Sequence, residues 1–77
     1  MKTTAYFRHT RKRPDRARIH DEWIQAAVKT PIKESIQTDG RVRRWTYVAA
    51  ERKYLRVVLL EDGETIHNAF FDRGFTL

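Results

Sequence analysis

The feature that most constrains the fold is a pair of apolar runs joined by a short turn in the last third of the 77-residue chain. Residues 54–60 and 64–71 are rich in β-branched and aromatic side chains, and Asp62-Gly63 lies between them. An Asp-Gly pair favours the positive φ angles of a tight turn whose twist matches that of the flanking strands. The pattern therefore predicts an antiparallel hairpin with Asp62-Gly63 as its two-residue turn.

A second Asp-Gly pair, at residues 39–40, separates two further extended segments, residues 32–38 and 41–49. This spacing predicts a second hairpin, and a four-residue connection at 50–53 would join it to the first. The segment 32–71 is therefore expected to form four antiparallel strands in a meander.

One main helix is expected before the sheet, within the segment 19–31. Asp21 and Glu22 supply the negative charge that a helix N-terminus favours, and Pro31 ends the pattern. The apolar side chains recur at helical spacing and form one stripe: Trp23, Ile24, Ala27 and Val28. Because an isolated helix of this length is marginal, the stripe predicts packing against the sheet.

The first 18 residues are expected to form a basic N-terminal arm. Residues Thr3 to Phe7 favour a short strand, since Thr, Tyr and Phe prefer extended structure. The segment from Arg8 to Arg18 carries six basic residues and one acid, and Pro14 suits the first turn of a helix. Two interpretations stay open for this segment: a solvated charged connection, or an arm that contacts phosphates.

These patterns together predict a single α+β domain, in which a short N-terminal strand or arm and one main helix accompany a four-stranded antiparallel meander sheet and a tail at 72–77. The chain has no Cys, so neither a disulfide framework nor a thiolate zinc site is expected. The N-terminus lacks the apolar run of a signal peptide, and no segment has the length needed to span a bilayer. A soluble cytoplasmic protein is the resulting expectation.

The charge balance points to acidic partners. The formal net charge is +6, and eleven of the sixteen basic residues are Arg. Arg makes bidentate contacts with phosphate and stacks on aromatic rings or bases. The composition therefore favours a nucleic acid, such as RNA, or an acidic protein as a partner.

Register assigns residues to the two faces of the sheet. Two-residue turns would pair Leu59 with Ile66, Val57 with Asn68 and Leu55 with Phe70. The face expected to receive the helix carries Leu55, Val57, Leu59, Ile66, Phe70 and Val48. The opposite face is expected to carry Trp45, Tyr47, Tyr54 and Phe71 with Arg43, Arg56 and His67, extended by Ile32, Glu34 and Ile36.

Aromatic rings interleaved with Arg on an open sheet suit single-stranded RNA, because bases stack on rings and phosphates pair with guanidinium groups. The same face is open to a different interpretation, in which it is buried under the N-terminal segment or pairs with a second copy in a homodimer. The candidate nucleic-acid-binding residues are Arg8, Arg11, Lys12, Arg13, Arg16, Arg43, Arg44, Trp45 and Tyr47.

Most enzyme chemistry finds no support in the chain. The histidines, His9, His20 and His67, lack metal-ligand spacing, and no Gly-rich phosphate loop or nucleophile elbow is present, so no metal or cofactor is expected. Cleavage of RNA by its own 2′-hydroxyl needs only a base, an acid and cations that stabilise the developing charge. Arg56, His67 and Arg73 are the candidate catalytic residues for that reaction, although a lone His on a strand is more often a structural or surface residue.

Several short stretches carry a family resemblance: Arg13-Pro-Asp-Arg16, Ile19, Trp23-Ile24, Ala27, Pro31, Asp39-Gly-Arg41 and Tyr54-Leu-Arg-Val-Val58. In these stretches and in its order of elements, the chain resembles small uncharacterised bacterial domains allied to the RelE/ParE toxin superfamily. The resemblance implies a compact α+β fold and relatives that cleave messenger RNA, either free or on the ribosome, or that poison gyrase. It also implies RNA or the ribosome, and a small acidic antitoxin-like protein, as partners. The positions that match residues of the active face in such toxins are Arg56 and Arg73.

The chain also departs from that pattern, because Leu59 or Leu60 stands where a Tyr is common and the series of catalytic Lys residues is missing. The leading hypothesis is therefore a toxin-like RNA-binding domain, with metal-independent endoribonuclease activity as an extension. The alternative is a nonenzymatic protein-interaction domain that homodimerises through its sheet face.

Overall fold

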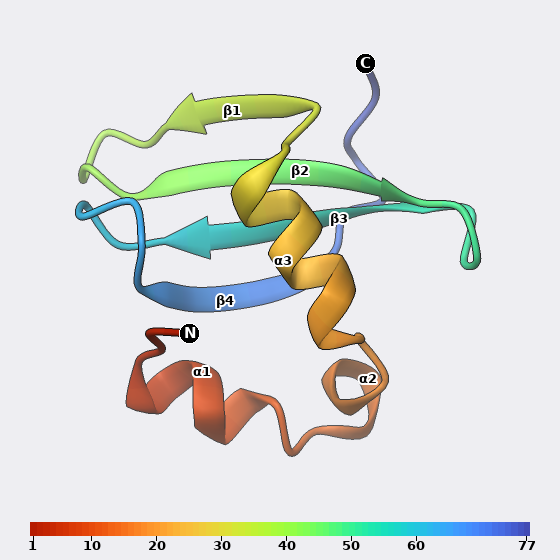
Figure 1. Ribbon diagram of the computed structural model, residues 1–77, viewed down its shortest axis with the longest axis horizontal. Helices are drawn as coiled ribbons and strands as arrows, with labels where there is room; N and C mark the ends of the chain where they lie inside the picture. Colours follow the sequence, from red (N-terminus) through yellow and green to blue (C-terminus); the bar gives the residue numbers. More distant parts are fainter.

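Four antiparallel strands form one sheet in the order β1-β2-β3-β4, and helices pack against it, as the computed structural model of residues 1–77 shows (Figure 1). The elements are α1 (Ala5–Thr10), α2 (Pro14–Ala17), α3 (Asp21–Lys29), β1 (Lys33–Ile36), β2 (Val42–Val48), β3 (Lys53–Leu59) and β4 (Ile66–Phe71). This arrangement confirms the predicted α+β class and the four-stranded meander. None of the helices has the length and apolar character needed to cross a membrane.

Helix α3 lies across one face of the sheet, with Ile24 and Ala27 fully buried (Figure 1). It begins one residue after His20 and ends before Pro31, as its sequence pattern predicts. The core beneath it contains five of the six residues expected there, Val48, Leu55, Val57, Leu59 and Ile66, together with Phe7, Ile19, Val42 and Ala69. The apolar stripe of the helix is therefore covered by one face of the sheet.

The N-terminal segment is helical, so the predicted strand from Thr3 to Phe7 is wrong. The side chain of Thr4 accepts a hydrogen bond from the backbone N–H of Phe7, which makes Thr4 the N-cap of α1. Only Thr3 keeps an extended contact, a single parallel bridge to Ile66. Pro14 opens α2, in agreement with its fixed φ angle.

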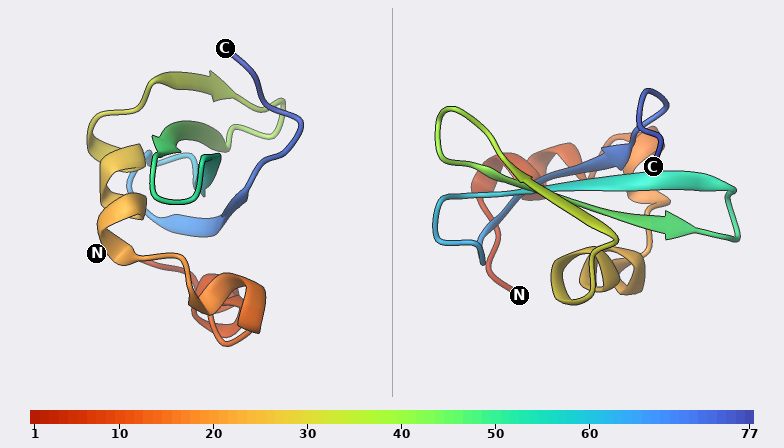
Figure 2. Two further views of the ribbon diagram at one scale, coloured as in Figure 1. Left: turned by 90° about the vertical axis from the view of Figure 1, so that its right-hand side faces the viewer. Right: turned by 90° about the horizontal axis from the view of Figure 1, so that it is seen from above.

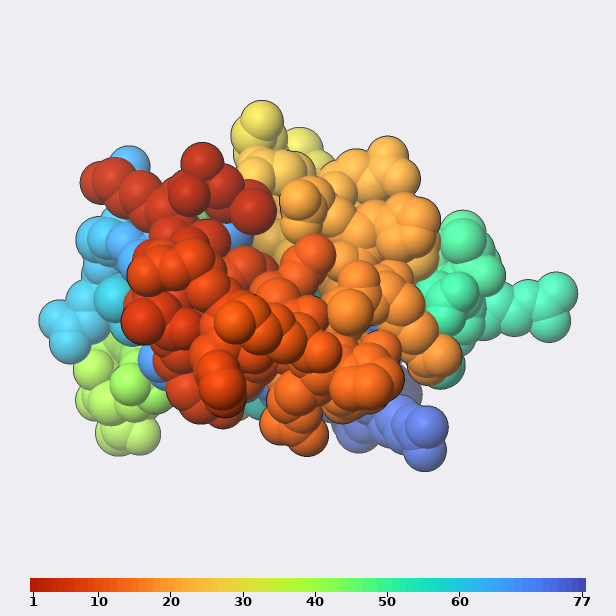
Figure 3. Space-filling model, turned by 90° about the horizontal axis from the view of Figure 1, so that it is seen from below, coloured from red at the N-terminus to blue at the C-terminus, as the bar shows by residue number.

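The two short helices lie beside β4 and close that end of the core. Phe7 of α1 is only 4% exposed, and Ile19, just after α2, is 1% exposed. Figure 2 shows both helices below the sheet, and Figure 3 shows the red and orange N-terminal segment covering that side of the molecule. The basic segment is thus folded as two short helices against the domain, and most of its charged side chains remain exposed.

The predicted two-residue turns are wrong at both hairpins. Gln37 N–H donates to the Arg41 carbonyl at 2.8 Å, which leaves three residues in the first turn. Leu60 N–H donates to the Thr65 carbonyl at 2.9 Å, which leaves four in the second. A two-residue type I′ turn needs positive φ at both central residues, but only the glycine of each pair, Gly40 or Gly63, has it.

Asp62 acts in the second turn through hydrogen bonds of its side chain. Its carboxylate accepts a hydrogen bond from the Thr65 hydroxyl and others from the backbone N–H groups of Thr65 and Glu64. These hydrogen bonds, that of the Thr65 side chain foremost, lower the pKa of Asp62 to about 2. The side chain of Asp62 therefore organises the turn by binding its backbone.

The longer first turn moves β1 by one residue, so the predicted position of Ile32, Glu34 and Ile36 on the face opposite the helix is wrong. In the observed register Glu34 pairs with Arg44 and Ile36 with Val42, on the face that α3 covers. Lys33 pairs with Trp45 and Ser35 with Arg43 instead. A one-residue shift has this effect because successive side chains of a strand point to opposite faces.

The connection between β2 and β3 also differs in length from the prediction, but the side chains of both strands stay on their predicted faces. Tyr47 pairs with Tyr54, whereas the expected partner of Tyr54 was Ala49. The shift is two residues, and a two-residue shift leaves every side chain on its original face. Arg43, Trp45 and Tyr47 therefore share a face with Tyr54 and Arg56, as predicted.

A β-bulge interrupts the pairing of β3 with β4. Leu59 pairs with Ile66 as predicted, but Val58 pairs with Asn68, so His67 is the extra residue. Beyond the bulge Leu55 pairs with Phe71, and the predicted pairs Val57–Asn68 and Leu55–Phe70 are wrong. Phe70 consequently leaves the core face for the opposite one, while Phe71 packs against the core beside Trp23, with ring centroids 6.2 Å apart.

Candidate nucleic-acid interface

The sheet face opposite α3 carries alternating arginines and aromatic rings. The Arg43 guanidinium lies 5.7 Å from the centre of the Trp45 ring, and the Arg56 guanidinium lies 5.5 Å from the same ring. Arg56 also lies 5.1 Å from the Phe70 ring, whose other cationic neighbour is Arg16 at 5.3 Å. We call these five residues the arginine–aromatic row. Each contact is within the range of a cation–π interaction.

Strand register builds the row. Trp45 of β2 pairs directly with Arg56 of β3, and Arg56 pairs directly with Phe70 of β4. Directly opposed side chains on one face of an antiparallel sheet are nearest neighbours. Phe70 reaches this position only because the bulge at His67 shifts the end of β4 by one residue.

Asp72 anchors the centre of the row from the tail. Its Oδ2 accepts hydrogen bonds from Trp45 Nε1 at 3.0 Å, Arg56 Nε at 3.0 Å and Arg56 Nη2 at 2.7 Å. Burial alone would raise the pKa of Asp72, but the hydrogen bonds from Trp45 and Arg56, together with the charge of Arg56, lower it below its usual value. Asp72 is therefore a carboxylate that neutralises Arg56 and fixes the orientation of its guanidinium.

Arg16 joins α2 to the end of the row. Its Nη1 donates to Asn68 Oδ1 at 2.6 Å and lies 3.4 Å from the Ala69 carbonyl. Its Nε lies 3.5 Å from the carboxylate of Asp15, whose side chain is largely exposed. The row thus extends from the sheet to the N-terminal segment, and it brings together residues that are far apart in the chain.

A basic cleft opens where the row meets α2. This cavity of about 250 Å³ is lined by Asp15, Arg16, Arg18, Lys53, Phe70, Phe71 and Arg73. Arg16 is the only one of its four cations with a carboxylate at ion-pair distance, because none of the ion pairs in the protein includes Arg18, Lys53 or Arg73. The cleft therefore combines unpaired positive charge with aromatic walls.

A second hollow of about 220 Å³ continues the cleft along the tail and shares Lys53, Phe71 and Arg73 with it. Its other walls come from Arg52, Tyr54, Asp72 and Phe75. Tyr54 makes edge contacts with Phe75 and with Tyr47, each at 5.1 Å between ring centroids. Tyr47 is 48% exposed, so the aromatic surface extends to solvent. We call this space the tail hollow.

Arg43 and Arg44 were both predicted to contact nucleic acid, and the structure places them on opposite faces. Arg44 Nε donates to Glu34 Oε2 at 2.6 Å, and Arg44 Nη1 donates to the Val28 carbonyl at 3.0 Å. These bonds join β2 to β1 and α3. Arg44 therefore lies apart from the arginine–aromatic row, to which Arg43 belongs.

The remaining predicted arm residues lie on α1 and in its connection to α2. Arg8 Nη1 donates to the Thr3 carbonyl at 2.7 Å. Arg11 Nη2 donates to Asp21 Oδ1 at 3.0 Å, and the Arg11 guanidinium lies 5.5 Å from the Phe7 ring centre. Lys12 and Arg13 are exposed between the two helices. Arg8 and Arg11 thus stabilise the N-terminal segment, and only Arg16 of the predicted arm residues lines the cleft.

His67 lies apart from the other candidate catalytic residues. Its Nδ1 is 3.1 Å from the Thr4 hydroxyl, and its ring stacks on that of Tyr6 with centroids 4.8 Å apart. Burial, assisted by the charge of Arg41, lowers the pKa of His67. No hydrogen bond or ion pair joins His67 to Arg56, which is paired with Asp72, or to Arg73 at the cleft. No group of three or more His, Asp or Glu side chains could hold a metal ion.

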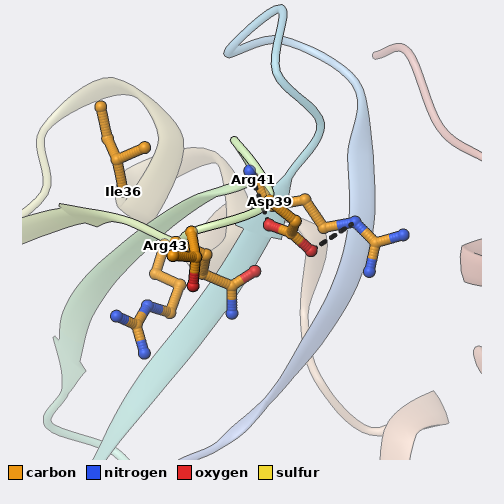
Figure 4. Close-up of a pocket in the computed structure, with 6 residues that line it drawn as sticks. Ile36, Asp39, Arg41 and Arg43 are labelled. Atoms are coloured by element: carbon orange, nitrogen blue, oxygen red, sulfur yellow. Dashed lines mark hydrogen bonds and ion pairs between the residues drawn. The ribbon is translucent and has the colours of Figure 1, made fainter.

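The largest hollow, about 930 Å³, lies at the turn between β1 and β2 and is lined by Ile36, Gln37, Thr38, Asp39, Arg41 and Arg43 (Figure 4). The carboxylate of Asp39 accepts from the backbone N–H of Arg41 at 3.0 Å and lies 3.8 Å from its Nε. In Figure 4 the guanidinium groups of Arg41 and Arg43 point away from each other. Because one turn supplies nearly all its walls and Arg41 is already paired, we regard the basic cleft as the better candidate site.

The residues that sequence analysis missed share a dependence on tertiary structure: Arg18, Lys53, Asn68, Phe70, Asp72 and Phe75. Phe70 is on this face because of the bulge, and Asp72 approaches Arg56 from a tail that shows no strand pattern. Only Arg18 and Lys53 carried a local signal of a site, namely their positive charge. Comparison with protein-family models, curated proteins and solved structures finds no match for this chain.

Proposed function

We propose that this protein binds single-stranded RNA, with the basic cleft holding backbone phosphates and the arginine–aromatic row lying beside the bound strand. The observation that carries the proposal is the position of Arg18, Lys53 and Arg73, three cations without carboxylate partners around one cavity. Cations that lack an internal partner are free to exchange their counterions for phosphates.

The aromatic walls favour a single strand over a duplex. Phe70 and Phe71 line the cleft, and Tyr47 and Tyr54 continue the aromatic surface along the sheet. Rings bind bases by stacking on their flat faces, which are accessible only when the bases are unpaired. Arginine guanidinium groups add stacking and bidentate phosphate contact in the same surface.

The proposal covers binding rather than cleavage. Arg56 would have to stabilise charge in a cleavage reaction, yet its guanidinium already pairs with the Asp72 carboxylate at 2.7 Å. His67, the candidate acid or base, contacts Thr4 and Tyr6 of the N-terminal segment. A metal-independent ribonuclease would therefore need these groups to rearrange.

The test is fluorescence anisotropy with a labelled RNA of roughly 12 nucleotides, a length within the range that one small domain covers. Three phosphate contacts predict a slope of about −2 for log affinity against log salt, or roughly a 20-fold loss between about 50 and 200 mM. The double variant Arg18→Ala/Arg73→Ala should weaken binding at low salt and reduce the slope by about 1.4.

Lys2→Ala/Lys29→Ala is the matched control, since it removes the same charge from exposed positions outside the cleft. It should change the slope by much less than the cleft variant. Equal losses in the two variants would indicate attraction by net charge alone, and an affinity independent of salt would exclude binding to phosphates.

The resemblance to the RelE/ParE superfamily adds a cellular form of this proposal, in which the RNA contact inhibits growth and an acidic antitoxin-like protein blocks it. Induction in a bacterium should then arrest growth, and the Arg18→Ala/Arg73→Ala variant should relieve the arrest. Normal growth at high expression of the folded protein would refute the toxin-like role, but it would leave the proposal of RNA binding standing.

The exposed ring of Tyr47 favours one alternative, a nonenzymatic interaction domain that homodimerises through this sheet face. Sedimentation equilibrium separates the two proposals. A dimer that Tyr47→Ser converts to a monomer would support the alternative, whereas RNA binding by a monomer would support the first.

A further inference from the structure

The chain stacks one of its own rings on the central aromatic residue of the row. The rings of Phe75 and Trp45 lie 4.6 Å apart between centroids, at an interplanar angle of 15°. The edge of Tyr54 meets Phe75 at 5.1 Å and 72°. Trp45 lies on the face that α3 leaves open, yet it is only 5% exposed, with Phe75 stacked on it and Arg43 and Arg56 beside it. Phe75 thus occupies the place where a flat ligand would stack.

Few bonds hold Phe75 there. Its backbone N–H is 3.4 Å from the Asp72 carbonyl, and the Gly74 N–H donates to Asp72 Oδ1 at 3.1 Å. Beyond Phe75 the chain makes no hydrogen bonds, and Leu77 is 79% exposed. The stack on Trp45 and the edge contact with Tyr54 are therefore the main attachments of the last residues, so the ring can leave without disturbing the sheet.

The space beside Phe75 is suited to a nucleotide. Phe75 forms one wall of the tail hollow, and Arg52, Lys53 and Arg73 supply three basic side chains to the others. Lys53 and Arg73 also line the basic cleft, so the hollow and the cleft form one continuous positive surface. A phosphate held by these cations would place its base near the ring of Phe75.

We propose that Trp45 is a nucleobase-stacking position, that Phe75 occupies it in the free protein, and that a base of bound single-stranded RNA replaces the Phe75 ring. This inference rests on the proposed function and adds a position for one base. Stacking accepts any base, because every base has a π-face, so the exchange discriminates single strands from duplexes rather than one sequence from another.

Because Phe75 and a base would occupy the same place on Trp45, the tail competes with RNA for that position. The apparent dissociation constant of a site equals its intrinsic value divided by the fraction of molecules in which the site is open. If Phe75 is stacked in about nine molecules of ten, removing the ring should tighten RNA binding by roughly tenfold.

The experiment compares Phe75→Ala with Leu77→Ala, both in a Trp23→Phe background that leaves Trp45 as the only tryptophan. Leu77→Ala is the control because it removes an exposed apolar side chain from the same tail and leaves the stack intact. Phe75→Leu is a second variant that keeps an apolar side chain at the position, and thermal melting verifies that each variant is folded.

Acrylamide quenching of Trp45 fluorescence measures whether the tail covers the ring, independently of RNA. Phe75→Ala and Phe75→Leu should increase quenching, and Leu77→Ala should not. RNA should then protect Trp45 from quenching in the Phe75 variants and bind these variants roughly tenfold more tightly. RNA that contains 5-iodouridine should form a photocrosslink to Trp45.

Unchanged quenching in the Phe75 variants would overturn the role of the tail. Increased quenching with unchanged affinity and no crosslink to Trp45 would overturn the stacking position, while the salt dependence of RNA binding by the unmodified protein would still support the proposed function. Loss of salt-dependent RNA binding in every variant would overturn both.

Discussion

Replacing Asp72 with Ala removes the acceptor of three hydrogen bonds at the centre of the arginine–aromatic row. Two of them come from Arg56 and one from Trp45, and the side chain of Asp72 is 10% exposed. Removing one partner of a buried ion pair costs about 3–5 kcal/mol, because the other charge is left without compensation. The Arg56 side chain is 25% exposed, so water solvates part of it, and we expect a loss of about 3 kcal/mol.

That loss is a large share of the stability of a small domain. At about 0.05–0.15 kcal/mol per residue, a chain of this length has roughly 4–12 kcal/mol of unfolding free energy. A loss of about 3 kcal/mol should lower the melting temperature by roughly 12–24 °C. Urea unfolding followed by circular dichroism gives the free energy, and a thermal scan gives the melting temperature. Asp15→Ala removes a largely exposed carboxylate that lies 3.5 Å from Arg16 and 3.7 Å from Arg13, and it should cost less than about 1 kcal/mol.

A double-mutant cycle identifies the partner responsible. Arg56→Met removes the cation and keeps an apolar stem on the face, so Arg56→Met/Asp72→Ala should be less destabilised than the sum of the single variants by about 1–2 kcal/mol. Strict additivity, or a loss of less than about 1 kcal/mol in Asp72→Ala, would refute the assignment of Asp72 as the anchor of the row.

Arg44→Ala should destabilise the fold by about 1–2 kcal/mol and leave RNA affinity unchanged. Arg43→Ala should weaken RNA binding and leave the free energy of unfolding nearly unchanged. Urea unfolding measures the stability of each variant, and anisotropy measures its RNA affinity. The pKa of His67 is lowered in the folded state, so the unfolded chain binds more protons; stability should fall as the pH decreases from about 6.5 towards the folded-state pKa, and His67→Gln should remove this slope. Leu55→Ala should cost about 2–5 kcal/mol, since its side chain is fully buried.

Local patterns predicted most of the architecture. The stripe of α3 and the two Asp-Gly signals were sufficient for one helix on a four-stranded meander, because amphipathic periodicity and turn residues act over a few neighbouring positions. The N-terminal segment was predicted wrongly because its Thr, Tyr and Phe residues favour a strand, whereas Thr4 acts as a helix cap and Phe7 is drawn into the core.

Residues of the candidate site were placed on the correct face of the sheet only where the error in strand register was an even number of residues. Arg43, Trp45 and Arg56 were placed on one face correctly, because the error in the β2–β3 connection was two residues. Phe70 was placed on the wrong face, because a bulge of one residue reverses every later side chain of the strand. The contact of Arg16 with Asn68 joins residues 52 positions apart and has no local signature.

The fold class, the basic and Arg-rich character of the chain, and the shared face of Trp45 and Arg56 follow from composition and short-range periodicity, so local patterns were sufficient to predict them. The turn lengths, the bulge at His67 and the approach of Asp72 and Phe75 to the row depend on contacts between residues distant in the chain, so they appear only in the folded domain. In β4 the backbone of Ile66, one residue before the bulge, bonds to Lys2 and Thr4 of the N-terminal segment, at 2.8 and 3.0 Å.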